Sequence, residues 1–166
     1  MDKENNDQIL DEKELLIKGK KRALRLLERK DYSRKELSDK LKIDGYAEEL
    51  VEKIIEYVDS YHYLDDIRVA GSYIRSRMEY KSKRELEYML KQKGISEEEI
   101  DSAMEENYKN DDNIPQEEVA IRKYLQKFHV DEDSFYDLSF EEKQKIAAKL
   151  YRKGFASEKI RKILQM

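Results

Sequence analysis

Apolar residues recur every three or four positions through most of this chain, which is the spacing of one face of an α-helix. Leu50, Ile54 and Val58 are a clear example. Only one proline and five glycines interrupt the pattern. It predicts nine helices and no strand, over residues of about 12–30, 33–42, 47–60, 66–79, 82–94, 96–108, 115–128, 140–153 and 156–165.

Local signals mark several of the helix ends. A serine followed three residues later by glutamate predicts a capping box, in which each side chain bonds the other residue's backbone N–H. The three examples are Ser33-x-x-Glu36, Ser82-x-x-Glu85 and Ser96-x-x-Glu99. A glycine followed by an apolar residue predicts a helix stop, and this occurs at Gly45, Gly94 and Gly154.

The chain also repeats itself. Residues 33–54 match residues 82–103 when shifted by 49 positions, and a weaker copy covers 145–164. A repeat of roughly 50 residues predicts stacked helical units that present a binding surface. We therefore expect an all-α fold of three tandem three-helix repeats stacked into an elongated, curved helical array. The expected parts are a flexible N-terminus at 1–10 and repeats 1, 2 and 3 at 11–62, 63–110 and 111–166.

Composition supports a folded, highly solvated helical protein. Charged residues make up 43% of the chain and hydrophobic residues 39%, and there is no cysteine, which excludes disulfides. No apolar run approaches the roughly 20 residues of a membrane span. The N-terminus is polar and unlike a secretion signal. We expect a cytoplasmic monomer with no membrane partner.

The net charge of −4 hides an alternation of charge along the chain. Residues 18–42 hold eleven Lys or Arg and four Asp or Glu, whereas residues 43–66 hold one Lys or Arg and eight Asp or Glu. The alternation continues, since residues 67–93 are again basic and residues 95–119 are acidic. One interpretation is a bipolar surface that meets phosphates on one flank and a basic protein on the other. The other, which composition favours, is a set of solvated faces that neutralise one another.

Candidate catalytic chemistry is sparse. His62 and His129 lie in different repeats and are interpreted as helix-end or loop residues, and there is no glycine-rich phosphate loop. The acidic pairs Asp111–Asp112 and Asp131–Asp133 lack the spacing of a calcium loop. We therefore expect that the protein is not an enzyme and that it binds no metal and no cofactor. A DNA-reading helix-turn-helix is disfavoured, because the third helices of repeats 1 and 2 are acidic.

Tyrosine is the abundant aromatic residue, with twelve in the chain. Tyr73 and Tyr124 fall on apolar stripes and are expected in the core. Tyr80 and Tyr88 flank a basic cluster and are the better candidates for stacking on bases.

Residues 61–77 and 81–95 together resemble the RecX family of bacterial regulatory proteins. The family pattern is an aromatic-Leu-Asp-Asp step, an Arg/Phe-x-Ala step, an Arg-x-Arg pair and a final Lys-Gly-Ile. The residues that fit are Tyr63, Leu64, Asp65, Asp66, Arg68, Ala70, Tyr73, Arg75, Arg77, Glu85, Leu86, Leu90, Lys93, Gly94 and Ile95. The resemblance extends more diffusely over about 20–165.

The resemblance implies a negative modulator of the RecA recombinase. Such proteins bind along the groove of the RecA–DNA filament and inhibit its extension, ATPase, strand exchange and coprotease activities. Contact with single- or double-stranded DNA is expected to be weak or indirect, because many members are basic and this chain is slightly acidic. The expected contact residues are Lys20, Lys21, Arg25, Arg68, Arg75, Arg77, Lys81, Lys83 and Arg84.

The family-motif residues, whether structural or in contact with the partner, are Tyr63, Leu64, Asp65, Asp66, Ala70 and Gly94. Asp65 and Asp66 stand where a helix begins, so one is expected to cap it, and the motif is also explained as a hinge between repeats 1 and 2. Two other functions stay open: a helical nucleic-acid-binding module without a recombinase partner, and a generic protein-interaction adaptor.

Overall fold

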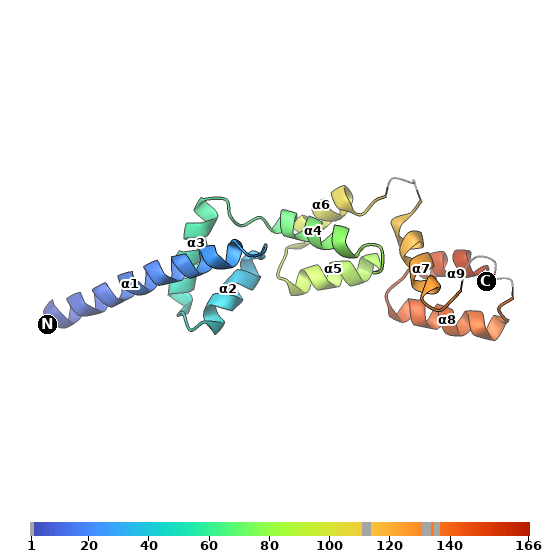
Figure 1. Ribbon diagram of the computed structural model, residues 1–166, viewed down its shortest axis with the longest axis horizontal. Helices are drawn as coiled ribbons and strands as arrows, with labels where there is room; N and C mark the ends of the chain where they lie inside the picture. The colour runs from blue at the N-terminus through green and yellow to red at the C-terminus, as the bar shows by residue number, and fades with distance from the viewer. Residues whose placement is uncertain (1, 111–113, 131–133, 135–136) are drawn as a thin grey trace. The chain divides into compact units, whose positions relative to one another are not determined.

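A computed structural model of the chain describes residues 2–110, 114–130, 134 and 137–166, with side chains from residue 11 onward. The described residues form nine helices and no strand, which confirms the all-α fold (Figure 1). The helices are α1 (Asp2–Leu27), α2 (Arg34–Ile43), α3 (Glu48–Ser60), α4 (Asp66–Arg77), α5 (Lys83–Gln92), α6 (Glu97–Asn107), α7 (Gln116–Gln126), α8 (Phe140–Arg152) and α9 (Ser157–Leu164). The elongated, curved stacking of the repeats stays a prediction.

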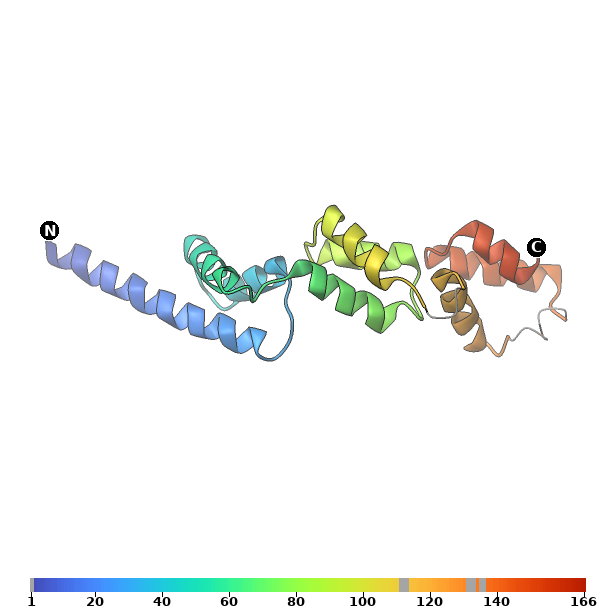
Figure 2. The ribbon, with the colours of Figure 1, turned by 90° about the horizontal axis from the view of Figure 1, so that it is seen from above.

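The main difference from the predicted elements is at the N-terminus. The apolar pattern places the first helix at about residue 12, whereas α1 begins at Asp2 (Figure 2). Residues 2–10 lack an apolar stripe but include good helix formers such as lysine and glutamate, so the helix continues beyond its buried face. Not every apolar residue of the predicted helices is buried: Leu15 and Phe128 are 48% and 46% exposed.

The chain gathers into two compact units. Unit 1 comprises Met1–Val69 together with Lys93–Ile95, and unit 2 comprises Ala70–Gln92 together with Ser96–Met166. The boundary therefore falls within α4, and the turn at 93–95 packs with the first repeat although it belongs by sequence to the second.

Unit 1 is built on the packing of α1 against α3. A side chain at Gly19 would overlap Ile54, so glycine allows the two helices to approach closely. The main apolar cluster of the unit draws its buried side chains from α1, α2, α3 and the segment after α3. They are Ala23, Leu26, Leu37, Leu41, Leu50, Val51, Ile54, Ile55, Val58 and Leu64.

Unit 2 contains most of the second repeat and the third repeat. Within the second, the buried apolar side chains are Ala70, Ile74, Leu86, Leu90, Ile100, Ala103 and Met104. Within the third, they are Ala120, Ile121, Leu125, Val130, Leu150, Phe155, Ile160, Ile163 and Leu164. No helix in the described part of the chain is both long and apolar enough to cross a bilayer.

Two of the three predicted capping boxes are confirmed, at Ser33 and Ser96, and Ser139 forms another at the start of α8. Ser82 accepts the Glu85 N–H at 3.1 Å, which is the first half of the box predicted there. Gly45, Gly94 and Gly154 stop their helices with φ angles of 97°, 74° and 86°, a left-handed conformation that favours glycine.

His62 and His129 follow α3 and α7 in the same left-handed region, each with a φ of 57°. Both histidines are therefore helix-end residues, as the sequence predicts. The Asp111–Asp112 and Asp131–Asp133 pairs lie outside the described residues.

Candidate partner-binding surfaces

The first group of basic candidates lies on α1. Burial of Ala23 and Leu26 against the core of unit 1 turns the opposite side of the helix outward, where Lys21 and Arg25 are exposed. Lys20 is half-buried, with its Nζ 4.2 Å from the centre of the Tyr57 ring. Lys21 and Arg25 are one helical turn apart, so they present neighbouring positive charges to a partner.

The Asp-Asp step of the family motif joins two helices. The carboxylate of Asp65 accepts the backbone N–H of Arg68 at 2.9 Å, which caps the start of α4 as predicted. The carboxylate of Asp66 accepts the backbone N–H of Arg34, the first residue of α2, also at 2.9 Å. Arg68 itself forms an ion pair with Asp31 at 3.0 Å. The two aspartates therefore have structural roles in unit 1.

The two arginines at the end of α4 make their contacts within unit 2. The Arg75 guanidinium group bonds the side-chain oxygen of Asn107 on α6, and it also donates to Ser72 Oγ at 3.2 Å. The Arg77 guanidinium carbon lies 4.2 Å from the centre of the Tyr73 ring. The sequence predicts that both side chains contact a partner. In the structure, Arg75 also helps to fix α4 on α6.

The remaining basic candidates lie around the start of α5. Lys81 pairs with Glu85 one turn on, and Lys83 lies 3.7 Å from Glu87. Arg84 is exposed, and its stem lies beside Gly154. Lys83 and Arg84 are exposed enough to reach a partner.

Most of the other family-motif residues are structural. Leu64 and Ala70 are buried at 9% and 0% exposure, and Gly94 supplies a left-handed turn. Tyr63 differs, because it is 48% exposed and stacks on Tyr61. Its side chain is therefore available to a partner.

Sequence reasoning missed a repeated connection between the repeats. Within unit 1, the buried Ser33 hydroxyl donates to the backbone carbonyl of Lys93 at 2.6 Å. Within unit 2, the buried Ser82 hydroxyl donates to the carbonyl of Lys153 at 2.7 Å. In both, the serine that caps the middle helix of one repeat binds the turn that ends the middle helix of the next. The repeat alignment was the signal, since it places Ser33 on Ser82.

The tyrosines fall into different environments. Tyr73 and Tyr124 are half-buried. Tyr80 is 50% exposed beneath the Lys123 and Lys127 ammonium groups, and Tyr88 is 61% exposed. Tyr57, Tyr61 and Tyr63 form an aromatic cluster at the end of α3, and only Tyr63 of the three was expected to matter, as a family-motif residue.

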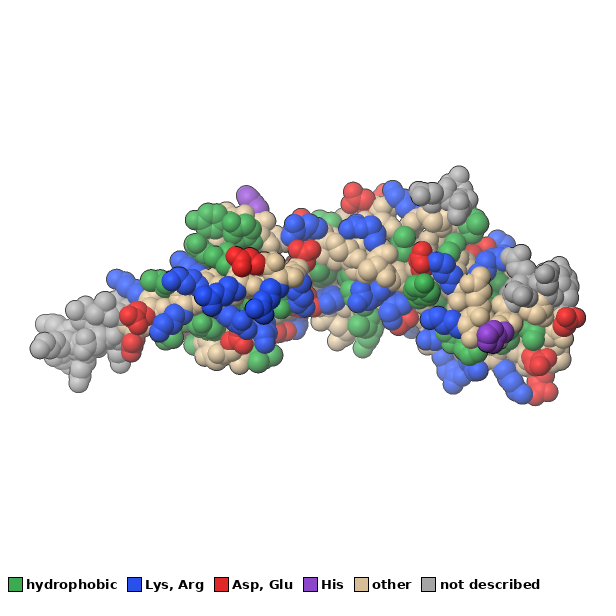
Figure 3. Space-filling view, viewed as in Figure 1, with side chains coloured by type: hydrophobic (Ala, Val, Ile, Leu, Met, Phe, Trp, Pro, Cys, Tyr) green, Lys and Arg blue, Asp and Glu red, His purple; other side chains and the backbone are tan. Residues whose placement is uncertain are grey.

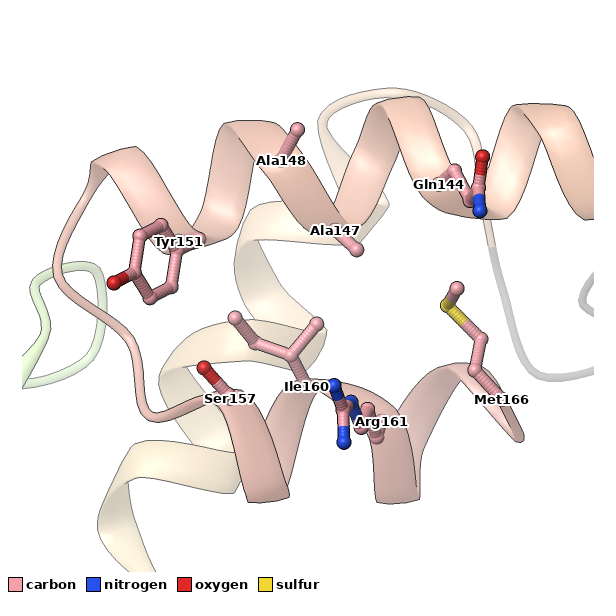
Figure 4. Close-up of a pocket in the computed structure, with 8 residues that line it drawn as sticks. All are labelled: Gln144, Ala147, Ala148, Tyr151, Ser157, Ile160, Arg161 and Met166. Atoms are coloured by element: carbon pink, nitrogen blue, oxygen red, sulfur yellow. The ribbon is translucent and has the colours of Figure 1, made fainter.

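A shallow hollow of about 360 Å³ lies between α8 and α9 (Figure 4). Ala147 and Ile160 form its apolar part, and Arg161 and Gln144 supply polar groups at its edge. Its lining is mainly apolar. Across the described residues, no group of three or more His, Cys, Asp or Glu side chains is placed to hold a metal ion.

Comparison with protein families gives three matches in order along the chain. The first, second and third three-helix domains of RecX match residues 20–57, 65–104 and 116–164. Together they cover more than half of the chain.

Individual relatives and solved structures agree with this. The regulatory protein RecX of Clostridium botulinum is 30% identical over 165 residues, covering 95% of this chain and 72% of that protein. RecX of Clostridium perfringens is 32% identical, covering 93% and 70%. The crystal structure of RecX from Lactobacillus salivarius superposes with a TM-score of 0.70 at 25% identity, over 90% of this chain and 94% of that one. A second RecX crystal structure, 22% identical, shares the fold with a TM-score of 0.77 over 98% of this chain and 77% of that one.

Proposed function

The chain belongs to the RecX family of regulatory proteins, and on that premise we propose that it binds the RecA–DNA filament and inhibits RecA. The observation that carries the proposal is the presence of all three family domains, in order, in one chain. The proposed activity is binding and inhibition, without catalysis by this protein.

The surfaces of the two units support this role. Lys21 and Arg25 in unit 1, and Lys83 and Arg84 in unit 2, are exposed cations on successive repeats. A filament repeats its own surface along its length, so several weak charged contacts can add up to long residence without a deep pocket. The acidic helices α3 and α6 would meet basic surface of the filament.

The direct test is the ATPase activity of RecA on single-stranded DNA with increasing amounts of this protein. We expect inhibition that approaches completion as the protein saturates the filament. Full ATPase activity at several-fold excess over filament sites would refute the proposal. DNA binding without inhibition of RecA would favour a nucleic-acid-binding module instead.

Charge reversal at Lys21 and Arg25 tests the α1 surface. Because both side chains are exposed, the double variant Lys21→Glu/Arg25→Glu should keep its helix content and thermal midpoint while a higher concentration is needed for half inhibition. A matched control, Lys145→Glu/Arg152→Glu, makes the same change of charge on α8. Equal weakening by both variants would show that overall charge, and not this surface, is responsible.

Reversal at Arg75 and Arg77 is also expected to weaken inhibition. The bond between Arg75 and Asn107 means that this variant needs a measurement of thermal stability beside the inhibition assay.

A further inference from the structure

Three tyrosines gather at the surface where α3 ends. The Tyr61 and Tyr63 rings are stacked, with centres 5.9 Å apart and planes inclined by 19°. Tyr57 meets the Tyr61 ring edge-on at 5.2 Å. Tyr61 and Tyr63 are 56% and 48% exposed. We call these three side chains the tyrosine platform.

The backbone fixes the platform. His62 adopts a left-handed conformation and donates its N–H to the Asp59 carbonyl at 2.8 Å, and Tyr63 donates its N–H to the Val58 carbonyl at 3.2 Å. The next residue, Leu64, is buried in the core of unit 1. The turn therefore sets Tyr61 and Tyr63 ring against ring and holds them there, so little conformational freedom is lost when a ligand stacks on them.

A hollow of about 450 Å³ lies beside the platform, with Tyr63 as one wall. Leu24 and Leu27 give it an apolar lining, and Glu28, Asp31 and Arg68 give it a polar rim. A planar ring that enters this hollow against Tyr63 would extend the Tyr61–Tyr63 stack. The rim groups could then bond the edge of that ring.

The platform lies between an acidic segment and a basic one. Residues 43–66, which include the platform, hold one Lys or Arg and eight Asp or Glu, whereas residues 18–30, in and just after α1, contain seven Lys or Arg and one Asp or Glu. Lys20 contacts the platform directly through the Tyr57 ring. Figure 3 shows a row of Lys and Arg side chains along α1 and a hydrophobic patch over the end of α3, with acidic side chains between them. This face of unit 1 therefore carries the tyrosine rings, then the hollow with its carboxylates, and then the cations of α1.

We propose that the tyrosine platform and its hollow bind an unpaired base of a single-stranded nucleic acid. The base stacks on Tyr63 inside the hollow, and the phosphates on either side lie along the cations of α1. This arrangement of aromatic faces beside a positive track is how proteins hold single strands without reading a long sequence. The site belongs to this chain alone, so it does not depend on the proposed action on RecA.

The rim favours bases that carry an exocyclic amino group. Carboxylates such as those of Glu28 and Asp31 accept hydrogen bonds from such groups, as from N4 of cytosine. Asp31 also pairs with Arg68, but a carboxylate has lone pairs for more than one donor. Phosphates would be repelled by the same carboxylates, which orients the strand with its bases inward.

The test uses the full chain without RecA and a fluorescent deoxycytidine strand of about a dozen nucleotides. A strand of the same length made of abasic sites carries the same phosphates but no bases. Anisotropy at low salt should show the deoxycytidine strand binding about five-fold or more tighter than the abasic strand. Equal affinity for the two strands would overturn the proposal, as would tighter binding of a duplex.

Substitutions then locate the site. Tyr61→Ala and Tyr63→Ala should reduce binding of deoxycytidine to the level of the abasic strand, while Tyr63→Phe should retain it, because stacking does not need the hydroxyl. Tyr151→Ala is the matched control, since Tyr151 is 62% exposed on α8, outside unit 1. Wild-type affinity in Tyr61→Ala and Tyr63→Ala would refute the assignment.

A measurement on the unaltered protein covers the case of a variant that fails to fold. Photocrosslinking to a deoxycytidine strand that carries 5-iodocytosine, followed by trypsin and mass spectrometry, should label the peptide between Lys53 and Arg68, which contains all three tyrosines. Crosslinks confined to other peptides would overturn the proposal. Because RecA is absent from every arm, failure here would leave the proposed inhibition of RecA untouched.

Discussion

Glu36 is a carboxylate whose charged form the fold stabilises. Burial alone would raise the pKa of Glu36, but the Lys93 ammonium group and the Ser33 N–H both bond the carboxylate and together hold that pKa below its ordinary value. A lowered pKa means that the charged carboxylate stabilises the fold above the unfolded pKa of about 4.3. That contribution is lost as the pH falls through the lower pKa of the folded state.

The variant Glu36→Gln should therefore be less stable than the wild type at neutral pH, by roughly 1 kcal/mol. The difference should shrink as both proteins are acidified from about pH 5, because the wild-type carboxylate then becomes neutral. Thermal unfolding of both proteins, followed by circular dichroism over a pH series, measures this difference in stability. Glu142→Gln is a control on an exposed capping glutamate of α8 and should cost less. A difference that stays constant with pH would contradict the assigned cause.

At the residue scale, local roles could be predicted and partners could not. The sequence predicts that Asp65 or Asp66 caps α4, because a carboxylate before a helix start has a local reason to be there. Nothing local to Arg75 indicates that Asn107, thirty-two positions later, accepts its hydrogen bond. The same limit hid the tyrosine platform, since the Tyr61–Tyr63 stack depends on the left-handed conformation of His62 between them.

At the scale of helices, capping serines that look alike in the sequence have two kinds of environment. Ser82 is buried, accepts the Glu85 N–H at 3.1 Å and donates to the Lys153 carbonyl. Ser96 is exposed, and its hydroxyl donates to its own Glu99 at 2.7 Å. Only the first serine connects two repeats, so the same substitution should have unequal costs.

Ser96→Ala removes one exposed cap and should destabilise the protein by about 1 kcal/mol. Ser82→Ala should cost about 2 kcal/mol, because the Lys153 carbonyl also loses its donor. The free energies of unfolding come from urea titrations of the two variants and the wild type. Equal costs would show that the bond to Lys153 adds nothing to stability.

Two helix-stopping glycines allow backbone strain to be separated from packing. Both Gly45 and Gly94 have positive φ angles, so alanine at either should cost about 1 kcal/mol in strain. A side chain at Gly45 would meet open space, whereas one at Gly94 would fall on the stem of Lys35 within unit 1. Gly94→Ala should therefore lower the thermal midpoint further than Gly45→Ala. Similar midpoints would mean that the Lys35 stem moves aside at little cost.

Helix boundaries were predicted closely because their signals are local. Cap serines place the starts of α2, α5 and α6, and stop glycines place the ends of α2, α5 and α8, all within about two residues, since each signal depends on a few neighbouring dihedral angles. The start of α1 at Asp2 was missed because residues 2–10 lack the apolar stripe from which the other helices are predicted. Which caps serve as connections could not be predicted either, because that depends on contacts 60 and 71 positions apart.

At the scale of the whole molecule, the repeat and the family motif predict the class of fold and the family, because both survive as patterns of residue types. Surface roles are harder to predict. A positive charge in the sequence can face a partner, as Arg25 can, or hold the fold together, as Arg75 does. The distinction depends on the packing of helices distant in sequence. The sequence therefore predicts which cations are candidates, but not which of them face a partner and which hold the fold together.

The sign of salt dependence tests whether local or net charge governs the proposed binding. The net charge is −4, so if the molecule acted as a single charge, added salt would screen its repulsion from a DNA-bearing filament and strengthen inhibition. If exposed cations such as Lys21 and Arg25 make the contacts, added salt should weaken inhibition. We expect the second result: the concentration for half inhibition of the RecA ATPase should rise several-fold between about 50 and 200 mM salt.

RecA alone, measured at each salt concentration, corrects for its own response. The Lys21→Glu/Arg25→Glu variant should show a shallower dependence, because two of the contacts that respond to salt are gone. A half-inhibitory concentration that falls with salt would show that the net charge dominates and that the α1 surface is not the one in contact.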